Sequence, residues 1–369
     1  MKSFVLRVFV VCLRLLYAPM KLCKTTDTIV WLSRQSAEPS EDMRLLSERL
    51  RARFPGVRQV FRLRPLRDAS GLSPGYVWGL FGDMRAMAGA RLVLTDTYSI
   101  AVSCLHHKKG TTVVQLWHAL GAVKKFSLQA AGKTQGRDAA VAKALHMHEG
   151  YDYVVAPSPA AADVYCEAFG CARSAIKVLS LPRVDVLLDG RTRRDEFLGE
   201  NPAFAGKPIV AYVPTFRTGD AAIAADLARA FADGPATLAV SPHPLTPFDG
   251  RPCGDYSSRD LIKLADAVVT DYSACAFEAA LLGKPLYFYV PDYEAYRAEQ
   301  GLNIDLRAEL PGTVFTDAAA LANAVAGGQY DFGALRAFAD KYVTHRGTDN
   351  TDALCDWLGG FLTPGKENQ

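Results

Sequence analysis

The chain has 369 residues, which exceeds the size at which one hydrophobic core usually stops growing, and this predicts two domains. With 49% apolar and 22% charged residues, the composition excludes a disordered chain. The net charge of only +3 argues against nucleic acid as the main partner, because binding to a phosphate backbone usually requires a concentrated basic excess.

The eight cysteines are scattered along the chain, with no CxxC pair and no His/Cys cluster at the spacing of a zinc site. We therefore expect reduced thiols in a cytoplasmic protein, without a disulfide framework. No metal site and no cofactor are predicted, and a requirement for Mg²⁺ stays open.

Residues 1–20 read MKSFVLRVFVVCLRLLYAPM, and Arg7 and Arg14 interrupt the apolar run at a spacing of seven. A membrane span or a signal peptide needs a longer uninterrupted run. In a helix ended by Pro19, both arginines share one face with Ser3, and apolar side chains cover the rest. We predict a basic, membrane-associating surface helix on the cytoplasmic face of the membrane. The alternative is a helix docked on the protein's own core.

After this segment, short β-rich runs alternate with helical stretches, as in the βαβ units of parallel sheets. The predicted strands of the first half are 28–33, 57–62, 91–95, 112–117, 153–156 and 176–179. The predicted helices are 42–54, 76–87, 138–148 and 160–169, the last capped by Ser158. Residues 21–188 are expected to form one Rossmann-like domain.

The stretch 189–207 is charged, has little periodicity and carries Gly and Pro near its end, which predicts an interdomain linker. A second alternation follows in residues 208–362, which are expected to form a second Rossmann-like domain. Its predicted strands are 209–213, 237–241, 267–270 and 286–289, and its predicted helices are 221–231, 273–282 and 317–326. The predicted class is α/β, with two Rossmann-like domains that face a central cleft.

Ligands of open α/β sheets bind outside the carboxyl ends of the strands, so the residues that follow each strand are the candidate site. His118 follows the predicted strand 112–117 in the sequence QLWHALGAVKK. A histidine there is placed to take a proton from an acceptor hydroxyl, because its ordinary pKa lies near 6.5. The competing interpretation is a packed, hydrogen-bonded histidine beside Trp117.

Two strand ends in the second half carry weaker signals. Thr215 and Arg217 follow the strand 209–213, and they offer a hydroxyl donor and a planar fork suited to phosphate. His243 follows the strand 237–241 between two prolines, which fix the backbone on both sides of the imidazole. A structural tripeptide and a turn with an incidental histidine are the alternatives.

The segment Asp271-Tyr272-Ser273 follows the strand 267–270 at the predicted start of a helix, where free N–H groups and the helix dipole favour an anion. This pattern predicts a phosphate-binding site in which Ser273 caps the helix and donates to a phosphate oxygen. For Ser273 the alternative is a cap alone, and for Asp271 it is a residue that orients the loop.

Several common nucleotide motifs are missing from the sequence. It contains no GxxxxGK[ST], no GxGxxG and no DxD, which removes the best evidence for ATP hydrolysis, dinucleotide redox chemistry and metal-clamped sugar nucleotides. The sequence HHKKG at 106–110 is interpreted as a solvated turn rather than a metal or phosphate loop.

These segments, in this order, resemble the CDP-glycerol:glycerophosphotransferase family of teichoic-acid synthesis, which includes primases and polymerases. The matching segments are Trp117-His118-Ala119, Thr215-Phe216-Arg217, His243-Pro244, and Ala265-Asp266 through Thr270-Asp271-Tyr272-Ser273. The resemblance spans about residues 112–296.

The resemblance implies a GT-B-like fold, a donor bound mainly by the C-terminal domain, and a lipid-linked acceptor at the cytoplasmic membrane face. It implies that His118 is the general base, with His243 as a second catalytic candidate. Thr215, Arg217, His243 and Ser273 would bind the diphosphate of CDP-glycerol or another CDP-polyol, with Asp271 beside them. The implied reaction releases CMP and adds one polyol phosphate to the acceptor.

The sequence departs from the family's pattern at three positions. Ala119 replaces the usual Gly, Ala274 replaces a Ser, and Glu278 stands where Asp is common. Since Ala tolerates positive φ poorly, Ala119 is expected to tighten the turn at His118. Two other functions stay open: a GT-B glycosyltransferase that uses a nucleotide sugar, and a non-catalytic membrane-bound scaffold of the same fold.

Overall fold

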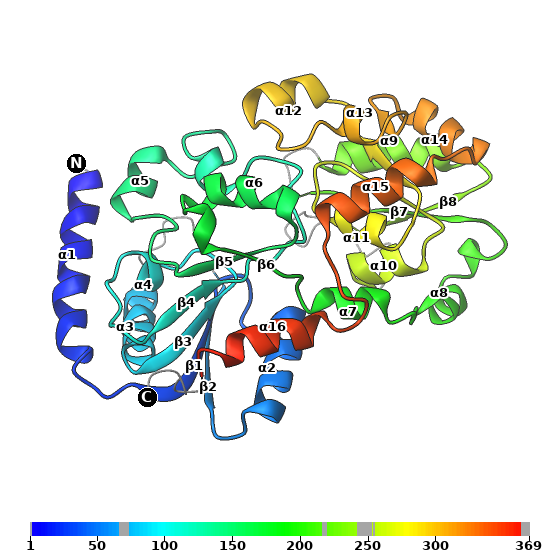
Figure 1. Cartoon of the computed structure of the whole chain (residues 1–369). Helices are drawn as coiled ribbons and strands as arrows, with labels where there is room; N and C mark the ends of the chain where they lie inside the picture. The colour runs from blue at the N-terminus through cyan, green and yellow to red at the C-terminus, as the bar shows by residue number, and fades with distance from the viewer. Residues whose placement is uncertain (1, 66–73, 216–219, 242–252, 254, 363–369) are drawn as a thin grey trace. The chain divides into compact units, whose positions relative to one another are not determined.

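The structure of the chain is a computed structural model, and it describes residues 2–65, 74–215, 220–241, 253 and 255–362. The chain divides into two compact units. The first unit consists of Met1–Ala119, Phe126–Asp185 and Thr344–Gln369, and the second of Leu120–Lys125 and Val186–Val343. Figure 1 shows a separate sheet with its own helices in each unit.

The first unit contains a six-stranded parallel sheet in the order β2-β1-β3-β4-β5-β6. Its strands are β1 (Thr26–Ser33), β2 (Arg58–Leu63), β3 (Ala90–Thr95), β4 (Thr112–Gln115), β5 (Tyr153–Ala156) and β6 (Ile176–Val178). All six predicted strands are present within two residues of their predicted ends. The apolar runs of β1, β3, β4 and β5 are mostly buried, as expected for a parallel sheet covered by helices, whereas the edge strands β2 and β6 are half-buried.

The observed helices of the first unit agree in most places with the ranges predicted from the sequence. They are α1 (Lys2–Met20), α2 (Glu41–Arg53), α3 (Pro74–Ala88), α4 (Ile100–Ser103), α5 (Ala139–Ala144), α6 (Pro159–Phe169), the start of α7 (Arg183–Leu188), and α16 (Asn350–Gly359), with 3₁₀ turns η1 (Ser127–Ala130) and η2 (Arg173–Ala175). Ser158 caps α6 as predicted, since its Oγ accepts a bond from the N–H of Ala161 at 3.1 Å. The predicted helix 138–148 is shorter, because His146 and His148 adopt positive φ.

The second unit contains a five-stranded parallel sheet in the order β11-β10-β9-β7-β8. Its strands are β7 (Ile209–Tyr212), β8 (Thr237–Val240), β9 (Ala267–Thr270), β10 (Leu286–Tyr289) and β11 (Val314–Phe315). Its helices are the rest of α7, α8 (Arg194–Glu200), α9 (Asp220–Phe231), α10 (Ser258–Leu264), α11 (Cys275–Leu281), α12 (Tyr293–Glu299), α13 (Leu306–Glu309), α14 (Ala318–Gly327) and α15 (Phe332–Tyr342), with the 3₁₀ turn η3 (Pro202–Phe204). The sequence did not predict β11, which has only two residues.

The two units differ from the predicted domain ranges 21–188 and 208–362 in three places. Residues 344–369, which include α16, belong to the first unit, where Arg53 of α2 pairs with Asp352 of α16 at 2.6 Å. Residues 120–125 belong to the second unit. The expected linker 189–207 contains α8 and η3, and Arg194 of α8 pairs with Asp266 at 2.8 Å. A chain that returns to an earlier unit leaves no local sequence pattern, so these exchanges were not predictable.

Helix α1 packs one face on the protein's own core, as the alternative interpretation expected, and leaves its other face exposed. Val10, Leu13 and Tyr17 pack into the core of the first unit, and each buried side chain of this kind contributes about 1.5–3 kcal/mol. The opposite face stays exposed and apolar, with Phe4 at 71% and Leu15 at 69% exposure. The stretch Ser3–Met20 has a mean hydropathy of 1.7 and is long enough to cross a membrane by length and composition, although its inner face packs on the protein.

The arginines of α1 do not share one exposed face as predicted. Arg7 is exposed, whereas the Nε of Arg14 donates to the carbonyl of Cys104 at 2.8 Å. The helix also continues one residue beyond Pro19, to Met20. The exposed surface of α1 is therefore more apolar and less basic than the sequence suggested.

Candidate functional site

The turn after β4 carries His118 and is held by a buried glutamine. Gln115, the last residue of β4, accepts a hydrogen bond from the backbone N–H of Trp117 at 2.9 Å and donates to the hydroxyl of Tyr151 at 3.0 Å. Trp117 has a φ of +59°, a strained conformation for a bulky side chain. The strand therefore ends at Gln115, two residues before its predicted end. The positive φ lies at Trp117 and not at Ala119, so the expected strain from Ala119 is wrong.

The imidazole of His118 is fixed in one tautomer. Its Nδ1 lies 2.9 Å from the backbone carbonyl oxygen of Asp96, and a carbonyl only accepts, so the proton is on Nδ1. This leaves the lone pair on Nε2. Burial lowers the pKa of His118 to about 4, although the bond to the Asp96 carbonyl opposes that shift. At neutral pH the ring is therefore an uncharged proton acceptor, which is the state a general base requires.

Three further ionisable residues of the first unit lie in this region, and the sequence analysis did not select them. Asp96 follows β3 and is 2% exposed, and the neighbouring side chains of Ser33 and Thr97 favour its ionised form. Burial raises its pKa to about 6. Asp42 and Arg183 form a buried pair, in which the Arg183 Nε donates to Asp42 Oδ2 at 2.8 Å, and both charges act on His118. Asp96 follows a predicted strand, so the strand-end rule contained the signal for it.

The residues directly after Ala119 belong to the second unit. Val123 accepts a backbone bond from Asn303 at 2.8 Å, and the N–H of Lys125 donates to Gly301 at 3.0 Å. At Gly121, a Cβ would lie 2.6 Å from the ring of Phe277, so a larger residue would displace α11 or the loop. Gly121 is thus explained by close packing in the second unit.

In the second unit, Asp271 organises the loop after β7. Its Oδ1 accepts a bond from the backbone N–H of Thr215 at 2.8 Å, and its side chain is fully buried. Thr215 Oγ1 is also buried and has no hydrogen-bond partner within the described part of the chain. Thr215 and Asp271, predicted separately from two strand ends, are therefore in direct contact. The contact agrees with the interpretation of Asp271 as a residue that orients the loop.

Ser273 lies at the predicted helix start, but α11 begins two residues later, at Cys275. Its Oγ accepts a bond from the N–H of Cys275 at 3.3 Å, so the hydroxyl proton stays available for another acceptor. Tyr272 stacks on Tyr296 with ring centroids 3.8 Å apart and donates to Asp292 at 3.1 Å. The loop that carries Ser273 is thus anchored by its neighbour.

Two predicted site residues, Arg217 and His243, lie outside the described residues, and their roles stay predictions. Among the residues that the structure describes, no group of three His, Cys, Asp or Glu side chains is arranged to hold a metal ion. The histidines of the sequence 106–110 lie before β4, at the opposite end of the strand from His118.

Comparisons with known proteins place the site in context. The model of the CDP-glycerol:poly(glycerophosphate) glycerophosphotransferase family matches residues 16–358. A teichoic acid ribitol-phosphate primase of Bacillus spizizenii is 29% identical over 92% of this chain and 93% of its own. A teichoic acid glycerol-phosphate primase of Bacillus subtilis is 23% identical over 75% of each chain.

The fold is also found in a solved structure. The wall teichoic acid polymerase TagF superposes with a TM-score of 0.71 over 98% of both chains, at 18% identity. This likeness confirms the predicted GT-B-like α/β class with two Rossmann-like sheets. Since the family model covers nearly the whole chain, this protein belongs to the CDP-glycerol:poly(glycerophosphate) glycerophosphotransferase family.

Proposed function

We propose that the protein transfers a polyol phosphate from a CDP-polyol to a lipid-linked acceptor in the synthesis of teichoic acid or a related envelope polymer, with release of CMP. The observation that carries the proposal is the neutral imidazole of His118, with the lone pair of its Nε2, at the carboxyl end of β4. Membership of the family supports the donor class. The named relatives include primases for both glycerol phosphate and ribitol phosphate, so the donor polyol is either of these.

In the proposed reaction, Nε2 of His118 accepts the proton of an acceptor hydroxyl as its oxygen attacks the β-phosphorus of the CDP-polyol. A new P–O bond forms to the acceptor, the bond from the β-phosphorus to the CMP oxygen breaks, and CMP leaves. Transfer of this kind depends mainly on positioning and on stabilising negative charge. The step needs no further reactant: the acceptor oxygen forms the new bond, CMP is the leaving group, and the proton of the acceptor hydroxyl passes to His118.

The donor diphosphate is assigned to the second unit. The hydroxyls of Thr215 and Ser273 are available to donate hydrogen bonds to phosphate oxygens. Arg217 and His243 would add cationic or polar contacts, on the sequence pattern alone. Asp271 would act by fixing the backbone at Thr215 rather than by touching phosphate, since a carboxylate beside a phosphate is repulsive.

We further propose that the protein is a peripheral protein of the cytoplasmic membrane face, held by the exposed side of α1. Phe4, Val5 and Leu15 are at least 60% exposed on this helix. An apolar helix face of this kind partitions into the headgroup region of a bilayer and raises the effective concentration of a lipid-linked acceptor. Deleting residues 1–20 would also remove core contacts, so substitutions on the outer face are the cleaner test.

The membrane proposal is tested with a variant that carries Phe4→Ser, Val5→Ser and Leu15→Ser. We expect less protein to sediment with phospholipid vesicles, with an unchanged melting temperature. Phe332→Ser is the control, because this side chain of α15 is 52% exposed in the other unit. Equal sedimentation of the variant, the control and the unmodified protein would contradict membrane binding through α1.

The reaction is tested by CMP release from purified protein, offered CDP-glycerol, CDP-ribitol and a UDP-sugar in turn with a lipid acceptor. We expect acceptor-dependent CMP release from one or both CDP-polyols. Turnover of the UDP-sugar alone would favour the glycosyltransferase alternative. Absence of turnover with every donor and acceptor would favour the scaffold.

A further inference from the structure

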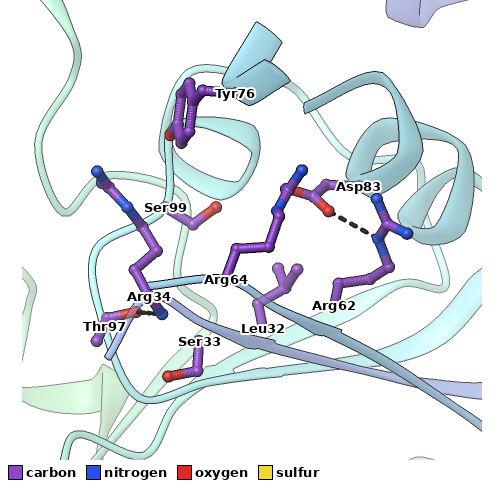
Figure 2. Close-up of a pocket in the computed structure, with 9 residues that line it drawn as sticks. All are labelled: Leu32, Ser33, Arg34, Arg62, Arg64, Tyr76, Asp83, Thr97 and Ser99. Carbon is purple, nitrogen blue, oxygen red and sulfur yellow. Dashed lines mark hydrogen bonds and ion pairs between the residues drawn. The ribbon is translucent and has the colours of Figure 1, made fainter. Parts of the chain in front are cut away.

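A pocket rich in arginine lies at the carboxyl end of the first sheet (Figure 2). Arg34 follows β1, Arg62 lies near the end of β2, and Arg64 comes just after β2. Ser99 follows β3. Figure 2 shows the side chains of Arg34 and Arg64 rising from neighbouring strands, with Ser99 between them. Asp83 of α3 completes the charged groups of the lining.

The pocket holds more positive than negative charge. Asp83 pairs with the Nε of Arg62 at 2.9 Å and with Arg64, so one carboxylate is shared by two guanidinium groups. Arg34 makes no ion pair with any described residue. It donates to the carbonyl of Tyr98 at 3.3 Å and lies over the ring of Tyr76 at 5.5 Å. Counted over the described lining residues, three guanidinium groups and one carboxylate leave two positive charges uncompensated.

Two donors in this pocket also lack an acceptor. The Nε of Arg34 and the Nη1 of Arg64 are buried without a hydrogen-bond partner in the described structure. A buried N–H of a charged group without a partner is costly, which favours an acceptor at Nε of Arg34. Nη1 of Arg64 lies against the backbone of Gly79 in α3, so Arg64 contributes mainly its charge. The enclosed space is about 10 Å³, which is room for one oxygen-sized group. One oxygen of an anion would fill this enclosed space, and the other atoms of the anion would lie at the opening of the pocket.

Phosphate suits these donors better than other anions. Guanidinium groups bind phosphate oxygens with short, charge-assisted hydrogen bonds. At neutral pH a phosphodiester carries one negative charge and a diphosphate diester carries two. The Ser99 hydroxyl makes no capping bond to α4, so it adds an uncharged donor. A lipid-linked diphosphate would therefore neutralise both positive charges, and the phosphodiester of a polyol phosphate already added would neutralise one.

The place of the pocket connects it with the acceptor rather than the donor. Arg34 and His118 follow β1 and β4 of one parallel sheet, and only β3 lies between these strands. Two strand spacings correspond to about 10 Å. Thr215 and Ser273, which are assigned to the donor, belong to the other unit. A group held at Arg34 therefore lies about one sugar or polyol unit away from the hydroxyl that His118 would activate.

We propose that Arg34, Arg64 and Ser99 bind a phosphate group of the acceptor, while the acceptor's hydroxyl reaches His118. This inference rests on the proposed function, and it adds that the acceptor is recognised through a phosphate next to its reacting end. The phosphate belongs either to a lipid-linked diphosphate or to a polyol phosphate already added.

Binding is tested first, without turnover, by calorimetry of the full chain with glycerol 3-phosphate and with glycerol. We expect saturable binding of glycerol 3-phosphate only, weakened about tenfold by Arg34→Gln, because a charge-assisted hydrogen bond is lost. Arg58→Gln is the matched control, since Arg58 is exposed at the opposite end of β2 and its loss changes the net charge equally. Equal weakening by both variants, or no saturable binding, would overturn the proposal.

Asp83→Asn gives a test of opposite sign. The substitution removes the one carboxylate of the pocket, so the positive charge rises and glycerol 3-phosphate should bind more tightly. If the arginines serve only to neutralise Asp83, the variant would lose stability without tighter binding. Melting temperatures of both variants separate a folding defect from a binding effect.

Kinetics then separates this proposal from the proposed reaction. With acceptors that carry a phosphate, Arg34→Gln should raise the acceptor KM about tenfold, with little change in kcat or in the KM of the CDP-polyol. A lipid-linked diphosphate acceptor and a soluble polyol phosphate acceptor, tested side by side, identify which phosphate is bound. Changed donor KM alone would assign the pocket to the donor and overturn the inference. Phosphate binding that depends on Arg34, without CMP release from any donor, would retain the pocket and refute the reaction.

Discussion

The carboxyl ends of the two sheets carry different kinds of polar groups. At the first sheet they are ionisable side chains held by the protein, among them His118 on the Asp96 carbonyl and the buried pair of Asp42 and Arg183. At the second sheet they include the hydroxyls of Thr215 and Ser273, and the buried carboxylate of Asp271 holds the backbone N–H of Thr215. In the first unit, burial sets the protonation state of ionisable side chains such as His118. In the second unit, hydrogen bonds to the loop backbone fix the positions of the hydroxyl donors.

This difference matches the two tasks of the proposed reaction. Proton removal needs a base whose protonation state is set before the substrate arrives. Binding a diphosphate needs several donors at fixed positions and little change in protonation. Substitution of His118 at the first edge should therefore alter rate and pH dependence, whereas substitutions at the second edge should alter donor affinity.

His118→Ala is expected to have the largest effect. Loss of a general base typically lowers kcat by about 10²–10⁴-fold, while the KM of the CDP-polyol should change little because the donor contacts lie in the other unit. His106→Ala is the control, since this exposed histidine precedes β4 at the opposite end of the strand. Steady-state CMP release measures both. A similar loss in the two variants, or full activity of His118→Ala, would contradict the assignment.

Asp96→Asn is expected to stabilise the protein at pH 7.5. The rise in the pKa of Asp96 from 3.8 to about 6 corresponds to about 3 kcal/mol that opposes its ionisation in the folded state. Because the folded pKa is raised, the stability that the protonated carboxyl provides is present below about pH 4 and is lost as pH rises through 6. Denaturant unfolding at pH 7.5 and at pH 4 measures the difference, which should be larger at pH 7.5. A destabilised variant at pH 7.5 would show that the contacts of Asp96 with Ser33 and Thr97 outweigh the cost of its burial.

Thr215→Val tests the second edge and should have a smaller effect. Its buried hydroxyl has no partner in the described structure, so its loss should raise the KM of the CDP-polyol about tenfold and leave stability unchanged. Thr270→Val is the matched control, because the Thr270 hydroxyl donates to the carbonyl of Val213 at 2.7 Å. That control should lower the melting temperature and leave donor KM unchanged. The reverse pattern would remove Thr215 from the donor site.

The sheets and the order of the motifs were predictable, because they depend on local patterns. Apolar runs of four to eight residues between turn signals predicted ten of the eleven described strands. The rule that ligands lie at the carboxyl ends of parallel strands then selected His118, Thr215, Asp271 and Ser273. Two of these residues, Asp271 and Thr215, were predicted from separate strand ends and are in direct contact in the structure.

The arginine pocket and the tautomer of His118 were not predictable. Arg34, Arg64 and Ser99 are about thirty residues apart from one to the next, and only the strand order β2-β1-β3 places them together. The tautomer depends on one carbonyl of a neighbouring strand. Helix α1 shows a third case, since its apolar residues look alike in sequence although some pack inside and others face outward.

The most direct test of the account is the pH dependence of kcat/KM for acceptor-dependent CMP release, because this ratio reports the ionisation of the free enzyme. Since burial lowers the pKa of His118 to about 4, its neutral form persists well below pH 6.5. We predict a rate that stays level from pH 8 to about 5.5 and declines only in more acidic solution, with this decline absent in His118→Ala. A decline centred near pH 6.5 would show a solvated histidine of ordinary pKa, and an acid limb retained in His118→Ala would assign the base to another residue.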